Sequence, residues 1–137
     1  MQRANIPGAV RGYTSHADKL LRISDRLDDI NTARVLLHEA AHAMLHGPDR
    51  GFITTEQYAA SAHRGTAEIQ ADGAAYVLAD LLGLDTCHAS VGYVAGWATA
   101  AAGSTTDTEA ITATVRGTAA AILHAVNTIA AAIGLDD

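Results

Sequence analysis

The N-terminal part of the chain is polar except for one short apolar run. Residues 1–16 carry few apolar side chains and are interrupted by glycines. The run Leu20–Ile23 has the length and composition of a strand, and we predict that it pairs with Val10–Thr14. The next segment, residues 25–31, is polar and is predicted to connect this small β element to the rest of the chain.

The spacing of apolar residues then becomes helical. A first helix is predicted from Ala33 to Leu45, with Thr32 as its N-cap and the pair Gly47-Pro48 at its end. Its apolar side, which we expect to face the core, consists of Val35, Leu36, Ala40, Ala43 and Met44.

Two long helices are predicted further along the chain. The first runs from Ala67 to Leu82, with Thr66 as its N-cap and Gly83 at its end. The second runs from Asp107 to Ile133 and is followed by Gly134. One face of this last helix is apolar at helical spacing, and we expect it to pack against the core. That face consists of Ile111, Val115, Thr118, Ile122, Val126, Ile129 and Ile133.

Two shorter helical stretches, over residues 56–62 and 90–101, complete the predicted elements. Together they predict an α+β fold, mostly α, with a small N-terminal β element and about four helices. A chain of 137 residues is expected to form a single domain, residues 1–137. Hydrophobic residues make up 49% of the chain but aromatic residues only 4%, so the core is expected to consist of closely packed, alanine-rich helices.

Charge and cysteine content argue against several classes of function. The net charge is −6 and the nine Lys and Arg residues are scattered, so direct binding of nucleic acid is not expected. Cys87 is the only cysteine, which excludes an intramolecular disulfide and fits a reducing compartment. The sequence shows neither the apolar region of a signal peptide nor an apolar run long enough to cross a membrane. We therefore expect a cytoplasmic protein without a membrane partner.

The strongest chemical signal is the sequence His38-Glu39-Ala40-Ala41-His42. Residues four apart on a helix point the same way, so His38 and His42 can present two imidazoles to one ion. Glu39 lies about 100° further around the helix axis, beside the ion rather than on it. This is the H-E-x-x-H arrangement of zinc peptidases, and it falls inside an independently predicted helix. The competing interpretation is a pair of helix histidines that only pack in the core.

A catalytic zinc ion usually has three protein ligands and one open position. The candidates for the third ligand are His46, His63, Glu68, Asp72 and His88. His46 lies a further turn along the same helix, where it is expected to cap the C-terminus, a position that favours a cation. Glu68 is preferred because it lies in the first turn of the next strong helix. Asp72, one turn later, can orient a ligand histidine by accepting its second ring N–H. Two solvated acids near a helix N-terminus would give the same pattern.

Several segments of the chain are similar in sequence to one group of metallopeptidases. They are Leu37–Gly47, Glu68–Tyr76, Leu82–Asp85 and the single residues Ser90, Tyr93 and Trp97. The stretch from Arg34 to Trp97 resembles the gluzincin-type domains of the ImmA/IrrE metallopeptidases. It resembles more closely the C-terminal zincin-like peptidase domain of ArdC-type antirestriction proteins and related polyvalent proteins of phages and plasmids.

The resemblance implies a minimal zincin-like domain that binds Zn²⁺, with Glu68 as the third zinc ligand. The implied activity is hydrolysis of a peptide bond in a protein or peptide substrate, with Glu39 as the general base. The resemblance also places Tyr93 near the site, where its hydroxyl can stabilise the oxyanion. A tyrosine packed in the core beside Trp97 is an equally good interpretation of that residue.

Other features leave the function partly open. His63 and His88 are alternative donors to the oxyanion, and the strand near Leu20–Ile23 is a candidate for pairing with an extended substrate. ArdC-type proteins also carry a single-stranded-DNA-binding domain, for which these 137 residues have no room. Resemblance therefore does not supply the substrate. The alternative function is a non-catalytic, metal-stabilised zincin scaffold that acts as a binding or regulatory protein. Glu39 favours the enzyme, since a structural metal site has no use for its carboxylate.

Overall fold

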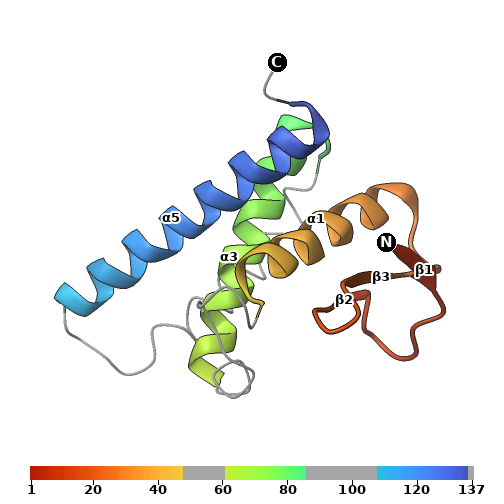
Figure 1. Ribbon diagram of the computed structural model, residues 1–137, viewed down its shortest axis with the longest axis horizontal. Helices are drawn as coiled ribbons and strands as arrows, with labels where there is room; N and C mark the ends of the chain where they lie inside the picture. Colours follow the sequence, from red (N-terminus) through yellow and green to blue (C-terminus); the bar gives the residue numbers. More distant parts are fainter. Residues whose placement is uncertain (48–60, 86–107, 136–137) are drawn as a thin grey trace.

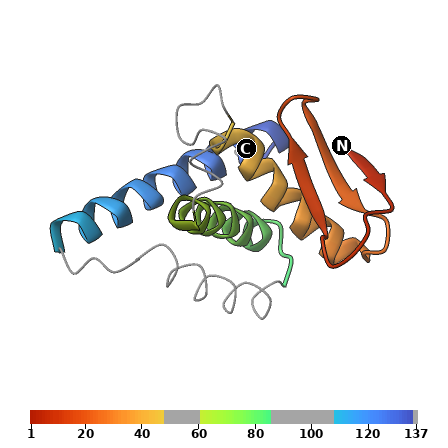
Figure 2. The same cartoon turned by 90° about the horizontal axis from the view of Figure 1, so that it is seen from below.

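The structure, a computed structural model, describes residues 1–47, 61–85 and 108–135. Helix α1 lies between a small sheet and the other two helices (Figures 1 and 2). In chain order, the described elements are β1 (Gln2–Ala4), β2 (Gly12–Ser15), β3 (Leu20–Ser24), α1 (Asp29–Leu45), α3 (Ser61–Leu81) and α5 (Thr108–Ile133). The predicted α+β fold, mostly helical, is confirmed for these residues. The helix predicted over residues 90–101 lies outside them, and so does most of the one predicted over residues 56–62.

The sheet has the strand order β1-β3-β2. Strand β2 pairs antiparallel with β3, from Gly12 opposite Ile23 to Ser15 opposite Leu20, which confirms the predicted strand pair. Strand β1 pairs parallel with β3 and was not predicted, because its sequence of two polar residues and an alanine has no apolar pattern. The guanidinium of Arg3 holds this strand in place by donating hydrogen bonds to the backbone oxygens of Asp25 and Leu27.

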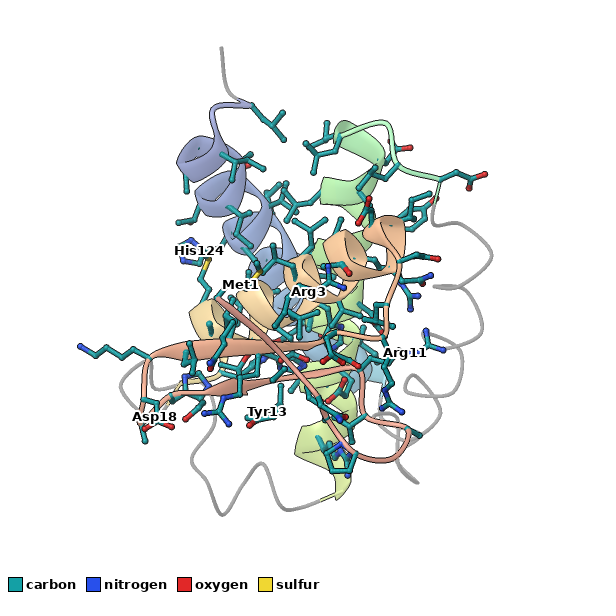
Figure 3. All side chains as sticks on the ribbon, turned by 90° about the vertical axis from the view of Figure 1, so that its right-hand side faces the viewer. Met1, Arg3, Arg11, Tyr13, Asp18 and His124 are labelled. Carbon is teal, nitrogen blue, oxygen red and sulfur yellow. The ribbon has the colours of Figure 1, made fainter. Side chains whose placement is uncertain are left out.

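The sheet packs against α1, as Figure 3 shows from the sheet side. The approach is close at Gly12, where an added Cβ would lie 2.6 Å from Cγ1 of Val35 and 3.0 Å from the backbone oxygen of Arg22. A side chain at this position would therefore push β2 away from the helix. Tyr13 points to the other side of the strand, where its hydroxyl accepts a hydrogen bond from Arg22.

Helix α1 begins earlier than predicted. Its N-cap is Asp28 rather than Thr32, and the Asp28 side chain accepts a 2.8 Å hydrogen bond from the backbone N–H of Asn31. That bond lowers the pKa of the Asp28 carboxyl below its usual value. Thr32 lies inside the first turn, where its N–H bonds to the backbone oxygen of Asp28. Aspartate and threonine are both favoured at N-caps. Asp28 is the N-cap here because the first helical hydrogen bonds already begin at that residue.

The buried side of α1 is wider than the predicted apolar side, because the helix is covered on two sides. Val35 faces the sheet at Gly12. Leu37, Ala41 and Leu45 belong to the core shared with α3 and α5. Of the residues predicted from the spacing, Val35 is buried as expected. The other four, Leu36, Ala40, Ala43 and Met44, are only partly buried.

Helix α3 also starts earlier than predicted. Ser61 is its first residue, so that the expected N-cap Thr66 and the glycine before it, Gly65, both lie within the helix. The predicted end is confirmed: Gly83 adopts a φ of 71°, and the N–H of Leu84 bonds to the backbone oxygen of Ala79. This is a helix C-terminus of the type that glycine favours.

Alanines dominate the contacts among the three helices, as the composition predicted. The alanines at these contacts that are fully buried (0% exposed) are Ala41, Ala71, Ala74, Ala79 and Ala125. Leu45 and Leu78 are the large side chains that are fully buried with them. Small side chains allow helix axes to approach closely.

The predicted apolar face of α5 is correct in its centre and wrong at its C-terminal end, and the side chains of Ile111 and Val115 lie outside the described residues. Val126 and Ile129 are buried, and Ile122 packs where an added Cβ at Gly73 would lie 2.6 Å from its Cδ1 atom. Ile133, in contrast, is 50% exposed. In the part of the chain that the structure describes, no helix combines the length and apolar character needed to cross a bilayer.

Candidate metal centre

Three side chains from two helices converge on one point, as the sequence predicted. His38 and His42 lie one turn apart on α1 and face α3, which carries Glu68. The Nε2 atoms of the two histidines are 3.0 Å apart. Oε2 of Glu68 lies 3.3 Å from Nε2 of His38 and 3.6 Å from Nε2 of His42. His38, His42 and Glu68 are thus placed so that they can hold a metal ion.

These distances fit a tetrahedral ion. Bonds of about 2.0–2.1 Å at tetrahedral angles separate neighbouring donor atoms by about 3.3–3.4 Å. The three observed separations of 3.0, 3.3 and 3.6 Å lie on both sides of that value. The ligand set of two imidazole nitrogens and one carboxylate oxygen therefore needs only small side-chain movements to surround a cation.

Asp72 orients the first histidine, also as predicted. Its Oδ1 atom lies 2.8 Å from Nδ1 of His38. A carboxylate can only accept at this distance, so the proton of the neutral His38 ring is held on Nδ1 and the lone pair of Nε2 faces the ligand cluster. The second oxygen, Oδ2, is buried and has no hydrogen-bond partner among the described residues. Asp72 is thus a buried acid whose described hydrogen bond goes to a metal-ligand candidate.

The ring of His42 is oriented by His46 and Gln70, for which the sequence predicted no such role. Nδ1 of His42 lies 2.8 Å from Nδ1 of His46, and Nε2 of His46 lies 2.8 Å from Oε1 of Gln70 on α3. His46 is the C-cap residue of α1, as expected. The expected cation is not present there, because burial lowers the pKa of His46 to about 4.

Glu39 faces the sheet rather than α3. Its side chain is buried, and its Oε2 atom accepts a 2.8 Å hydrogen bond from the hydroxyl of Thr14 on β2. The same hydroxyl lies 2.8 Å from the backbone oxygen of Glu39, so its one proton is shared between these two acceptors. The strand therefore fixes the carboxylate that follows the first histidine, a contact that the sequence pattern did not reveal.

The charges around the cluster favour a cation. Burial lowers the pKa of His38, but the hydrogen bonds and charges of Asp72 and Glu68 outweigh it and raise the pKa to about 9. Burial raises the pKa of Glu68, but its contacts with His38 and His42 hold it well below its usual range. A positive charge beside an ionised Glu68 is therefore stable in this site, and a metal ion can supply it.

The structure does not place the remaining predicted site residues. Tyr93 and His88 lie outside the described residues, and so does the side chain of His63. Glu68 and His42 have further interactions besides those given above.

Comparison of the chain with protein-family models, with curated proteins and with solved structures found no match. The function must therefore be argued from the geometry and chemistry of this site.

Proposed function

We propose that this chain is a zinc-dependent peptidase with a zincin-like fold. One observation carries the proposal: the donor atoms of His38, His42 and Glu68 all lie within 4.8 Å of one another, and Glu39 follows the first ligand on the same helix. The motif predicted that the two imidazoles face one ion, and the position of Glu68 beside them supports its interpretation as more than a pair of packed histidines.

Zinc is proposed because of the donor set. Two imidazole nitrogens and one carboxylate oxygen form the ligand set of many catalytic zinc sites, whereas calcium and magnesium prefer oxygen ligands alone. Three ligands leave one position of a tetrahedral ion for water or substrate. When bound, zinc would supply an activated water at neutral pH and a Lewis acid for the scissile carbonyl.

The chain's own residues would move the proton. Glu39 carries the carboxylate nearest in sequence to the ligands, and Thr14 fixes that carboxylate through a 2.8 Å hydrogen bond. We propose that Glu39 accepts a proton from the attacking water and later delivers it to the leaving amine. His38 and His42 are not proposed as bases, since their Nε2 lone pairs are the proposed ligand atoms.

A protein or peptide is the proposed substrate, and the sheet offers one way to bind it. Strand β3, the earlier candidate for substrate pairing, is central in the sheet, and within the described residues β2 is one of the two edge strands. Thr14 of this edge strand contacts Glu39. An extended peptide paired with β2 would therefore run close to the proposed base.

The proposal is tested by metal analysis and a proteome-wide cleavage screen. The purified protein is expected to contain about one zinc per chain, as the three-ligand site implies. Wild type should cleave, whereas Glu39→Gln should keep the zinc and lose cleavage. Asp29→Asn is the matched control, because it makes the same acid-to-amide change at an exposed position of α1. A chain that binds no metal, or a Glu39→Gln variant that cleaves as wild type does, contradicts the proposal.

The burial of Glu39 favours one alternative, a metal-stabilised scaffold that binds a partner without cleaving it. Glu39 is only 7% exposed, and its carboxylate is bound by Thr14, as in a purely structural contact. In that case zinc would stabilise the fold, and Glu39→Gln would change stability but no cleavage would be detected in any variant.

A further inference from the structure

His42 belongs to a chain of buried hydrogen bonds that the proposed reaction does not use. The chain runs from Nδ1 of His42 to Nδ1 of His46, and from Nε2 of His46 to Oε1 of Gln70, with both distances 2.8 Å. All three side chains are buried. A buried polar atom is costly unless it is paired, so each link constrains the next.

The acceptor at Gln70 sets the direction of these hydrogen bonds. An amide oxygen can only accept a hydrogen bond, so Nε2 of His46 must carry the proton. The neutral His46 ring then has a lone pair on Nδ1, and that lone pair can only accept from the N–H at Nδ1 of His42. His42 is left with its lone pair on Nε2, the atom that lies 3.0 Å from Nε2 of His38.

We propose that His46 and Gln70 are positioning residues that hold His42 in the tautomer and ring orientation required of a metal ligand. The inference rests on the metal site of the proposed function and adds two residues to it. Asp72 does the same for His38 with a charged acceptor. The two ligands are thus oriented differently, one by a carboxylate and the other by a neutral pair.

Nitrogen-15 NMR of the histidine rings tests the tautomers without metal or activity. The protein is labelled on its histidines and kept in a chelator near neutral pH. We expect His42 to be protonated on Nδ1 and His46 on Nε2. The opposite pattern, with His42 protonated on Nε2, overturns the inference. It would arise if the Gln70 side chain presented its NH₂ group to His46, because every hydrogen bond in the chain would then reverse.

A matched pair of variants tests the role in metal binding. In His46→Asn, the amide oxygen replaces the acceptor at Nδ1, whereas in His46→Gln the longer side chain replaces only Nε2 and leaves His42 without that acceptor. Zinc affinity, measured by competition with a chromophoric chelator, should fall about 10- to 100-fold in His46→Gln and much less in His46→Asn. The absorption spectrum of bound Co²⁺ should change in the same order. Equal zinc affinities in the two variants overturn the inference.

A second pair of variants covers the case in which a change at His46 prevents folding. Gln70→Glu keeps an acceptor for His46, whereas Gln70→Met removes it at similar size. Zinc affinity should be retained in the first and reduced in the second, and the reverse order overturns the inference. These readouts are independent of cleavage. A wild type that binds zinc but cleaves nothing contradicts the peptidase, whereas the wrong His42 tautomer contradicts the inference even in an active enzyme.

Discussion

The hydroxyl of Thr14 lies 2.8 Å from a carboxylate oxygen of Glu39, so that β2, an edge strand of the sheet, holds the proposed base. Thr14→Val removes this hydrogen bond and keeps the shape of the side chain. We expect kcat to fall about tenfold, which corresponds to about 1.4 kcal/mol, because a less fixed carboxylate takes up the proton less efficiently. Steady-state cleavage of a peptide found in the screen measures the effect.

Thr14→Ser is the control for this prediction, because serine keeps the hydroxyl. It should retain most of the activity of the wild type. Zinc content should be the same in all three proteins. In the described structure the hydroxyl of Thr14 bonds to Glu39 and not to any of the three proposed ligands. Equal kcat values for Thr14→Val and wild type would show that this contact has no part in catalysis.

Asp72 should control zinc affinity through His38. Its Oδ1 atom is 2.8 Å from Nδ1 of His38, and it accepts the proton that holds the ring in position. Asp72→Asn weakens this acceptor and removes a buried charge, so we expect zinc affinity to fall about 10- to 100-fold. Competition with a chelator measures the change.

The matched control is Asp80→Asn, on the same helix but at an exposed position. It should leave zinc affinity unchanged, because its side chain lies away from the ligands. A similar loss of affinity in both variants would point to the overall charge of the protein rather than to the contact with His38.

The proposed ligands of the site could be predicted from the sequence because they follow local rules. His38 and His42 share a helix face through their spacing alone. Glu68 and Asp72 are one turn apart on the next long helix, and the resemblance to zincins pointed to the same glutamate. The structure brings all four side chains together as expected.

The contacts that orient these residues could not be predicted, because each joins distant parts of the chain. Thr14 and Glu39 are 25 positions apart, and His46 and Gln70 are 24 positions apart. His46 carried a partial signal, since it continues the face of His42, but Gln70 had none. The predicted helix starts were wrong because a residue type alone does not define an N-cap. Thr32 and Thr66 have side chains that suit an N-cap, yet both helices begin before them.

Gly12 should be essential for the packing of β2 on α1. In Gly12→Ala the new Cβ meets Val35, whose branched side chain is stiff, and the backbone of Arg22. We expect a loss of about 1–3 kcal/mol in the free energy of unfolding, the usual effect of overpacking. Gly117→Ala is the control, because nothing lies within 4 Å of its Cβ position on α5. It should stabilise the protein by about 0.5–1 kcal/mol through helix propensity. Urea unfolding measures both values, and equal effects would contradict the close approach.

The effect of zinc on stability should grow as the pH rises. The folded chain raises the pKa of His38 from 6.5 to about 9, since Asp72 and Glu68 outweigh the effect of burial. With a chelator present, protonated His38 therefore contributes stability that is complete below pH 6.5 and is lost as the pH rises through about 9. A metal ion requires the same ring without its Nε2 proton, so zinc affinity should increase over this range. The melting temperatures with zinc and with chelator should thus separate progressively between about pH 6 and about pH 9.

Thermal unfolding at a series of pH values measures this separation, and two histidine variants show where it originates. His38→Gln should remove most of the pH dependence, because the ring that binds either a proton or the metal is lost. His124→Gln should leave it unchanged, since His124 lies exposed on α5 (Figure 3). A separation that stays constant with pH would mean that protons and zinc do not compete for His38, and the ion would then have to bind elsewhere.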